Sequence, residues 1–580
     1  MEGISAIESE RGVWNWKRRW RLWTSLLDQR EDQVFLLLTL LIGALVGLTV
    51  VAFIVVTERL GMRLYPPGGA AWRRVLVPVA GSLAMGYLLY RYFPDARGSG
   101  VPQTKAALFA REGRIGLGTI LGKFFCTATT LASGIPLGRE GPSVQVGAGI
   151  ASVLGRALGL RPEKVKALLP VGAAAAIAAA FNTPMAAVLF SLEEVMGDLH
   201  APVLGSVVLA SATSWAMLRL LLGNNPLFHV PQYELVHPLE FGIYAALGVA
   251  GGLLSAAFTK LLLGMRQRFL RLPRKTRWCH PVVGGVLVGL MGWFVPQVLG
   301  VGYSYVGDAL NSHMALKLMA LLVVLKLFAV TTSYASGNAG GIFGPSLFLG
   351  AMLGGAIGSV AHHFLPAYTA IPGAYALVGM GALFAGIVRA PMTSVLMIFE
   401  MTRDYSVIVP LMIANLVSLF ISSRLQKQPI YEALAHQDGI HLPNVKTRDV
   451  PDHRRVVQVM RNAQESLPAQ MGIREAAERL RSSEIRTWTV THEGTLVGVL
   501  SWAKLEKALE TDGASGKKLY DLLDTIDFPH VHSDQALHLA LERMSAERLD
   551  LLPVVNRADI HKLEGVVTLR DILDSYGVDV

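Results

Sequence analysis

Cysteine is nearly absent from this sequence, which contains only Cys126 and Cys279 among 580 residues. Two cysteines cannot form a disulfide framework, and no Cys/His cluster has the spacing of a metal site. No Ser/His, Cys/His or metal-ligand arrangement supports catalysis either. We therefore expect a protein that is not an enzyme and that requires no metal or organic cofactor for its main activity.

Charged residues are also scarce. They make up 17% of the chain, against 52% hydrophobic residues, and the mean hydropathy is +0.43. This composition excludes an ordinary soluble protein. Several apolar runs reach about 20 residues, which is enough to cross a hydrocarbon layer of ~30 Å. The long runs are Val34–Thr57, Val75–Tyr92, Val203–Leu222, Phe241–Leu263, Pro281–Val295 and Leu316–Thr331.

Two other apolar stretches, Val101–Leu108 and Pro142–Leu154, are too short to span a bilayer upright. We interpret them as half-helices or re-entrant segments. Irregular backbone at membrane depth survives only where protein covers it or water reaches it. The sequence therefore predicts a polytopic α-helical membrane protein with broken helices.

The net charge of +10 suggests a nucleic-acid partner at first, but the basic residues are placed as in a membrane protein. Four of them lie within residues 17–21, before the first span, and six lie between Arg266 and Arg277, in one predicted loop. By the positive-inside rule we expect a cytoplasmic N-terminus, a cytoplasmic mid-chain loop and no nucleic-acid partner. Residues 2–32 lack a signal-peptide pattern and predict a Trp-rich interfacial helix.

The sequence contains an internal repeat. Gly141-Pro142-Ser143 recurs after 203 residues as Gly344-Pro345-Ser346, with the glycines that follow at matching positions. Further along, Glu193 recurs as Glu400 at an offset of 207. Two copies of an apolar unit broken by Gly and Pro are typical of a transporter whose ion site lies between the copies, at the broken helix ends.

Long apolar runs stop near Gln437, and charged residues become frequent from there to Val580. This part predicts two α/β modules, each with the order helix, strand, turn, strand, helix. The first should use residues 473–481, 487–491, 493–494, 496–500 and 502–509, and the second residues 533–547, 551–555, 556–561, 564–568 and 569–575. The order and the closing segments 498–501 and 565–571 resemble a tandem pair of cystathionine-β-synthase-type (CBS) domains.

Four separated segments of the membrane part are distinctive in order and spacing. They are Gly98-Ser99-Gly100-Val101-Pro102, Gly138-Arg139-Glu140-Gly141-Pro142, Gly341-Ile342-Phe343-Gly344-Pro345 and Tyr431. Together they resemble the CLC family of chloride channels and transporters, over roughly residues 30–436. Val101 stands where the family more often has Ile, and Gly344 where some members have Ala. The resemblance implies two repeats, inverted relative to each other, and a homodimer in which each subunit holds its own pathway.

A dehydrated chloride needs donors such as backbone N–H groups, hydroxyls and the positive ends of helix dipoles. Both glycine-rich loops supply flexible backbone, and Ser99 and Tyr431 add hydroxyls. By resemblance, Ser99 and Tyr431 hold the central chloride, and Ile342, Phe343 and Gly141 contribute to the same site. The alternatives are a simple turn residue for Ser99 and an interfacial aromatic anchor for Tyr431.

Glu140 is the most informative residue of these segments, because a carboxylate at membrane depth costs roughly 2.5–3.5 kcal/mol to insert. Among anion donors it could take the chloride position itself, and once protonated it would have to leave. The resemblance implies that Glu140 is the gate and the external proton carrier. The alternative is a structural ion pair between Glu140 and Arg139.

Glu193 and Glu194 end the apolar run 184–192. On an α-helix neighbouring side chains point about 100° apart, so the two carboxylates cannot share one environment. By resemblance, Glu194 is the internal proton acceptor and Glu193 its neighbour, although the pairing of Glu193 with Glu400 in the repeat favours a structural role. The presence of Glu194 favours coupled exchange over a passive channel. The alternative is that Glu194 is an ordinary solvated residue at a helix end. Lys123 could support anion binding electrostatically, or its side chain could extend to the interface.

CBS domains often bind adenine nucleotides through a Thr/Ser-x-x-Asp pattern. The second module has Thr568 and Asp571, whereas the first has Ser501 with Lys504 where the Asp would stand. Regulation by ATP, ADP or AMP is therefore an expectation for the second module only. A structural or dimer-stabilising role is the alternative.

We therefore expect a homodimeric secondary active transporter that exchanges chloride for protons. The main alternative is a passive voltage- or pH-gated chloride channel on the same scaffold, and a second is a nucleotide-responsive membrane sensor that no longer conducts. The expected location is a bacterial inner (plasma) membrane with both termini cytoplasmic. The expected parts are the interfacial helix at 1–32, the transmembrane domain at 33–436 with repeats at about 33–222 and 238–436, and the CBS pair at 437–580 with modules at about 446–510 and 518–578.

Overall fold

The computed structural model describes residues 31–199, 203–223, 226–231, 233, 235–440, 442, 454–462, 466–481, 483, 485–510, 517–523 and 528–575. The interfacial helix expected at residues 1–32 lies outside these residues, apart from its last two, which begin α2. The described chain forms two compact units. Residues up to 104 and 113–430 form one, called the membrane unit, and residues 105–112 and 431–580 form the other, called the C-terminal unit.

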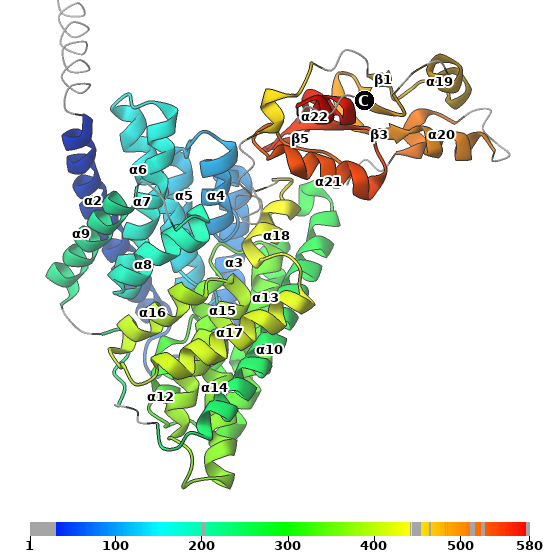
Figure 1. The fold of residues 1–580 in the computed structure, drawn as a ribbon. Coiled ribbons are helices and arrows are strands. Elements are labelled where there is room, and N and C mark those ends of the chain that lie inside the picture. Colours follow the sequence, from blue (N-terminus) through cyan, green and yellow to red (C-terminus); the bar gives the residue numbers. More distant parts are fainter. Residues whose placement is uncertain are drawn as a thin grey trace, which may run out of the picture. The chain divides into compact units, whose positions relative to one another are not determined.

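Two successive sets of helices with the same order build the membrane unit, except that residues 105–110 of α4 are grouped with the C-terminal unit. The first set is α2 (Glu31–Leu64), α3 (Arg73–Arg91), α4 (Val101–Ala110), α5 (Leu117–Ala132), α6 (Glu140–Ala157), α7 (Pro162–Phe181), α8 (Pro184–Phe190) and α9 (Leu204–Leu222). The second set is α10 (Glu240–Arg271), α11 (His280–Phe294), α12 (Tyr303–Leu310), α13 (Leu316–Ser336), α14 (Phe343–Phe364), α15 (Pro372–Val388), α16 (Pro391–Thr402) and α17 (Ile408–Leu425). The first set is blue to cyan in Figure 1, and the second, green to yellow, lies beside it.

The predicted membrane segments are helices in the structure. Seven of the described helices are long and apolar enough to cross a membrane, and every long apolar run lies within a helix apart from at most one end residue. The stretch Val101–Leu108 lies in α4, a helix of only 10 residues, whereas Pro142–Leu154 lies in α6, which is longer than expected at 18 residues. The predicted mid-chain basic loop is partly wrong, because α10 continues to Arg271 and carries Arg266 and Arg268 in its last turns. Cations are favoured there, since the helix dipole is negative at the C-terminal end.

The core of the membrane unit is formed by α7 and α15, which occupy equivalent places in the two sets and are almost completely buried. Small residues bring their neighbours close. A Cβ atom on Gly147 of α6 would collide with the carbonyl oxygen of Gly172 on α7, and one on Gly350 of α14 with that of Gly379 on α15. Close helix approach through small residues is the usual packing in membranes, where apolar burial gives helices little reason to associate.

The C-terminal unit contains α18 (Ile430–Gln437) and two α/β modules. The first module has β1 (Leu467–Pro468), α19 (Ile473–Leu480), β2 (Thr487–His492), β3 (Thr495–Ser501) and α20 (Trp502–Leu509), with β1 parallel and β3 antiparallel to β2. The second has α21 (Leu537–Glu547), β4 (Leu551–Asn556), β5 (Asp559–Thr568) and α22 (Leu569–Ser575), with β4 and β5 antiparallel. Each module has its own apolar core.

The predicted order of both modules is confirmed, and two boundaries are corrected. The turn expected at residues 556–561 is shorter, because Asn556 pairs with Asp559 across a tight hairpin. The side chain of Asn556 accepts a hydrogen bond of 2.9 Å from the N–H of Ala558, which stabilises this turn. Helix α21 begins at Leu537 rather than at residue 533, since Ala536 has an extended backbone.

Candidate anion and proton site

The two sets of helices meet at Gly138 and Gly341, which occupy equivalent positions in the repeat. Their backbones form an antiparallel bridge, with N–H to carbonyl distances of 2.7 Å in both directions. The loop before α4 joins this contact, because a Cβ atom on Gly100 would collide with the backbone of Gly141. Gly100 also has a φ of +105°, a conformation that favours glycine. The loops that precede α4, α6 and α14 therefore pack backbone against backbone.

Ser99 lies in the first of these loops and is fully buried. Its hydroxyl has no hydrogen-bond partner among the residues that the structure describes. Buried hydroxyls are nearly always hydrogen-bonded in native proteins, so such a group calls for an explanation. The position fits the predicted donor role of Ser99.

Glu140 is the first residue of α6 and is fully buried. Its carboxylate reaches the beginning of α14, where Oε2 accepts a hydrogen bond of 3.2 Å from the N–H of Gly344. The other oxygen, Oε1, accepts a hydrogen bond from the hydroxyl of Tyr303 at the start of α12. The carboxylate therefore occupies a place that is suited to an anion, because unpaired N–H groups and the helix dipole both favour negative charge there.

Arg139 does not neutralise Glu140. Among the described residues its ion pair is with Glu58 of α2, at 3.8 Å between Nη1 and Oε1. Its guanidinium carbon also lies 5.6 Å from the centre of the Tyr303 ring. The geometry thus favours the anion-site interpretation of Glu140 over a structural ion pair with its neighbour.

Ile342 and Phe343 lie at the beginning of α14 and are fully buried, as is the candidate ligand Gly141 in the first turn of α6. The first amides of a helix have no acceptor within that helix, so those of Ile342 and Phe343 are suited to an anion. The Phe343 ring packs against the rings of Phe181 and Phe384, with centroid distances of 4.9 and 4.4 Å. This aromatic packing fixes the beginning of α14 in place.

Lys123 of α5 is fully buried, and its side chain does not extend to an interface. Its ammonium donates hydrogen bonds to the carbonyls of Ala96, Arg97 and Gly98, at 2.8, 3.3 and 2.8 Å. These three residues directly precede Ser99. Lys123 thereby fixes the loop that carries the candidate donor, while its electrostatic effect on an anion stays a prediction.

Glu193 and Glu194 lie on a π-helical turn, Ser191–Met196, and not on the regular α-helix that their 100° separation assumed. Such turns are rare and often mark functional sites. The Glu193 carboxylate accepts hydrogen bonds from the N–H groups of Met392 and Thr393, at 3.3 and 2.8 Å, and from the Thr393 hydroxyl at 2.7 Å. It therefore caps α16. Glu194 is buried and makes none of these contacts, so it stays the candidate for the internal proton.

Tyr431 lies in α18 and is almost fully buried, with 1% of its surface exposed. It belongs to the C-terminal unit, whereas Ser99 belongs to the membrane unit. The predicted site shared by these two hydroxyls therefore stays a prediction.

In the second α/β module, Thr568 and Asp571 contact each other at the start of α22. The N–H of Thr568 donates to the Asp571 carboxylate and the N–H of Asp571 to the Thr568 hydroxyl, each at 3.2 Å. Asp571 is buried and also forms an ion pair with Arg461. This is the reciprocal pattern of a capping box, which gives both residues a structural use. Nucleotide binding here stays a prediction.

The sequence analysis missed Tyr303 and the capping role of Glu400. Extending the repeat alignment backward from Gly341 would have found Tyr303, since it begins the helix equivalent to α4. Glu400 was recognised as the repeat partner of Glu193, but its contacts depend on how the copies cross. Its carboxylate accepts hydrogen bonds of 3.0 and 2.7 Å from the N–H groups of Met185 and Ala186.

Comparisons with known proteins agree with this arrangement. A model of the voltage gated chloride channel family matches residues 80–423, and a model of the CBS domain matches residues 520–577. The chain is 33% identical over 386 residues to the H(+)/Cl(-) exchange transporter ClcA of Vibrio campbellii, which covers 65% of this chain and 82% of that protein. It is 35% identical over 381 residues to a protein of Ralstonia nicotianae provisionally named as ClcB-like chloride channel, which covers 64% of this chain and 88% of the relative.

A solved structure of a slow cyanobacterial Cl-/H+ antiporter is similar to this chain with a TM-score of 0.64 and 26% sequence identity, over 70% of this chain and 97% of that one. The family match extends over more than half of the chain. The chain therefore belongs to the voltage gated chloride channel (CLC) family and carries a C-terminal CBS region.

Proposed function

We propose that this protein exchanges chloride for protons across the membrane. The observation that carries the proposal is the position of the Glu140 carboxylate, which accepts the N–H of Gly344 at the start of α14. A carboxylate and a chloride need the same donors, so they compete for one place. Relatives named as H(+)/Cl(-) exchange transporters support the proposal.

In the proposed cycle, ionised Glu140 accepts the hydrogen bonds of the donors and so excludes chloride from them. Protonation removes the charge that holds the side chain there, so the neutral side chain leaves and chloride replaces it. Deprotonation reverses the exchange. Because one place serves both ions, movement of one is coupled to movement of the other.

Glu194 is the proposed internal proton acceptor. It is buried and lies on the π-helical turn, whereas its neighbour Glu193 is used as a helix cap. A carboxylate is expensive to bury at membrane depth and is rarely kept there without a function, which favours a role in proton transfer.

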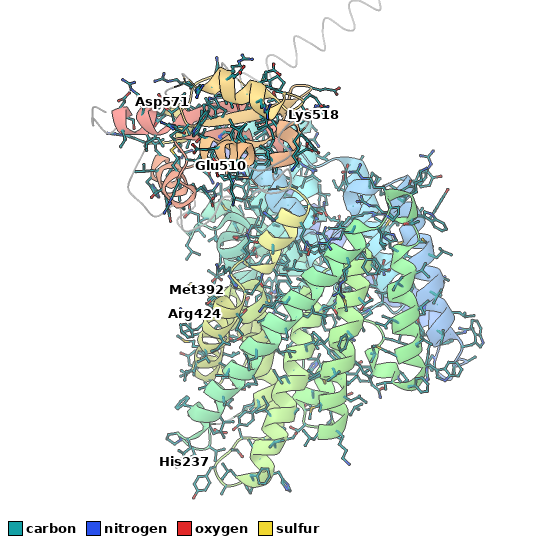
Figure 2. The ribbon with its side chains drawn as sticks, turned by 90° about the vertical axis from the view of Figure 1, so that its right-hand side faces the viewer. His237, Met392, Arg424, Glu510, Lys518 and Asp571 are labelled. Carbon is teal, nitrogen blue, oxygen red and sulfur yellow. The ribbon has the colours of Figure 1, made fainter. Side chains whose placement is uncertain are left out.

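The proposed assembly is a homodimer in a bacterial inner membrane, with both termini cytoplasmic. Met392 lies on an outer flank of the membrane unit (Figure 2) and is 52% exposed. Its repeat partner Met185 is 51% exposed. We propose that these residues lie at the subunit interface. Cross-linking of a Met392→Cys variant in native membranes should trap a dimer, whereas Leu290→Cys, an exposed residue on α11, should not.

The decisive experiment uses liposomes that contain the full-length protein and an outward or inward chloride gradient without a proton gradient. Under the proposal, chloride movement drives protons in the opposite direction and so builds up a pH difference that was absent at the start. Glu140→Ala should keep chloride flux and lose both proton movement and the dependence of flux on pH. A wild-type protein that conducts chloride but never moves protons uphill would contradict exchange.

That last result would favour the alternative, a passive voltage- or pH-gated chloride channel. The relative from Ralstonia nicotianae that is named as a chloride channel keeps this alternative open. The buried Glu194 favours exchange, since a passive channel has no use for an internal proton acceptor.

A further inference from the structure

Tyr303 begins α12, the second-set equivalent of the half-helix α4. The loops before the two helices are built alike. Gly100 and Gly302 precede the helices with φ values of +105° and +85°. Lys326 donates to the carbonyls of Val298 and Gly300 at 3.0 and 2.7 Å, as Lys123 does to the loop before α4. The second loop is therefore as firmly held as the one that carries Ser99.

The two copies differ in which residue at the start of the half-helix carries a hydroxyl. In the first copy Ser99 lies just before α4, and in the second copy Tyr303 is the first residue of α12. The Tyr303 hydroxyl donates to Oε1 of Glu140. Its ring makes an edge contact with Phe228 at 6.1 Å between centroids and lies beside the Arg139 guanidinium. The hydroxyl is thus aimed at the place that the Glu140 carboxylate occupies.

Gly344 provides a second, independent observation. A Cβ atom at this position would lie 2.9 Å from the Tyr303 hydroxyl and 3.2 Å from Oε2 of Glu140. Both distances are shorter than ordinary contacts of a methyl group, so any side chain here would displace the hydroxyl or the carboxylate. The chain therefore combines a tyrosine at 303 with the one residue at 344 that leaves room for its hydroxyl.

We propose that Tyr303 completes the anion site at the start of α14: its hydroxyl holds the ionised Glu140 in place and then donates to the chloride that replaces it. This inference rests on the proposed exchange and names a further positioning and anion-binding residue for it. A phenol is suited to this role because it stays protonated at neutral pH and donates without adding a full positive charge. A cation would bind the anion more tightly and slow its release.

Few charged groups lie around the Glu140 carboxylate in the part of the chain that the structure describes. Arg139 lies on the same loop as Glu140 and is paired with Glu58 of α2. Lys326 of α13 is directed at the loop carbonyls and lies 4.2 Å from the centre of the Phe348 ring. On α12 and α14 the groups that contact the carboxylate are the neutral Tyr303 hydroxyl and the Gly344 amide. Removal of the Tyr303 hydroxyl should therefore directly destabilise the ionised form of the Glu140 carboxylate.

The first experiment measures chloride flux from liposomes against pH for the wild type, Tyr303→Phe and the matched control Tyr305→Phe. Tyr305 lies two residues further along α12 and makes no hydrogen bond to Glu140. Without the Tyr303 donor the ionised carboxylate is less stable and takes a proton more readily. The pH of half-maximal flux should rise by about one unit in Tyr303→Phe, as for loss of a hydrogen bond to a charged group. It should stay unchanged in Tyr305→Phe.

Gly344→Ala should shift the flux profile in the same direction, and the double variant should shift it by less than the sum, because both changes act on one hydroxyl. Phenylalanine keeps the ring and its packing, so Tyr303→Phe should fold normally. A profile of Tyr303→Phe that coincides with those of the wild type and Tyr305→Phe would overturn the proposal, even if the wild type exchanges chloride for protons.

The second experiment does not depend on transport. Glu140→Ala removes the competing carboxylate, and isothermal titration with sodium chloride in detergent then measures anion binding directly. Adding Tyr303→Phe to this variant should weaken chloride binding about tenfold or more, as for loss of one hydrogen bond to a charged group. Adding Tyr305→Phe should leave it unchanged. Equal affinities in the three proteins would overturn the role of Tyr303 as an anion donor. If the wild type proves to be a passive channel, exchange fails while this binding result still decides the role of Tyr303.

Discussion

Glu193 and Glu400 occupy equivalent positions in the two copies of the repeat, and each carboxylate caps a short helix of the other copy. Glu193 accepts N–H groups at the start of α16, and Glu400 accepts those at the start of α8. A carboxylate at a helix N-terminus satisfies donors that have no acceptor within the helix. This reciprocal capping ties the two copies together next to Glu194.

We predict that Glu193→Ala and Glu400→Ala destabilise the protein to a similar extent, by roughly 1 kcal/mol each, because each leaves one exposed and one partly buried amide at a helix start without its acceptor. Thermal unfolding of the purified protein in detergent measures this loss. Glu193→Gln should recover part of it, since the amide oxygen still accepts a hydrogen bond. An unfolding midpoint of Glu193→Ala equal to that of the wild type would contradict the capping role.

We predict that Glu194→Ala keeps chloride flux and loses proton movement. Paired recordings of chloride and proton flux from the same liposomes measure the ratio of the two ions. Glu193→Gln serves as the matched neighbour and should still move protons. Proton movement that persists in Glu194→Ala would remove Glu194 from the proposed pathway.

We predict that Gly341→Ala destabilises the meeting point of the two copies. A Cβ atom at Gly341 would lie 3.1 Å from the amide nitrogen of Gly141 and 3.2 Å from Cδ of Pro142. Neither backbone nor ring moves easily, so the change should cost about 1–3 kcal/mol, as other overpacking does. Thermal unfolding and chloride flux should both decrease.

The control for this variant is Gly264→Ala on α10, where a Cβ atom meets nothing within 4 Å. It should leave both measurements unchanged or slightly raise stability, because alanine is the better helix former. Equal behaviour of Gly341→Ala and Gly264→Ala would show that the close contact has no energetic importance.

We predict that Lys123→Met loosens the loop that carries Ser99. Methionine fills a similar volume but leaves the carbonyls of Ala96 and Gly98 without their donor, at a cost of about 1–3 kcal/mol for each buried group. Chloride affinity and thermal stability should fall together. Lys260→Met, an exposed lysine on α10, should change neither. A stable Lys123→Met protein with normal chloride affinity would show that the loop holds its shape without the ammonium.

Many structural features of this protein depend on residues that are close in the sequence, and these features could be predicted from it. Apolar runs predicted the membrane helices, and strand and turn residues predicted both C-terminal modules, with α20 and α22 at their expected bounds. The paired Gly-Pro loops predicted two copies, whereas the ion site between them stays a prediction. These inferences succeed because the length of an apolar run and the chemistry of a turn depend on residues that are neighbours in the chain.

The contacts between the copies could not be predicted in the same way. Nothing near Tyr303 in the sequence indicates that its hydroxyl meets Glu140, and nothing near Glu400 indicates that it caps α8. The regular helix assumed at Glu193 was also wrong, because a π-helical turn places that carboxylate against α16. Each of these contacts joins residues that are far apart in the chain.

The sequence by itself determined that the chain crosses a membrane through broken helices, that it is built twice, and that a buried carboxylate lies at one break. Only the tertiary structure decided which donors that carboxylate meets and which helix Glu193 and Glu400 each cap. The reason is geometric: hydropathy and turn chemistry act over a few residues, whereas the partner of a buried polar group depends on how two distant helices cross.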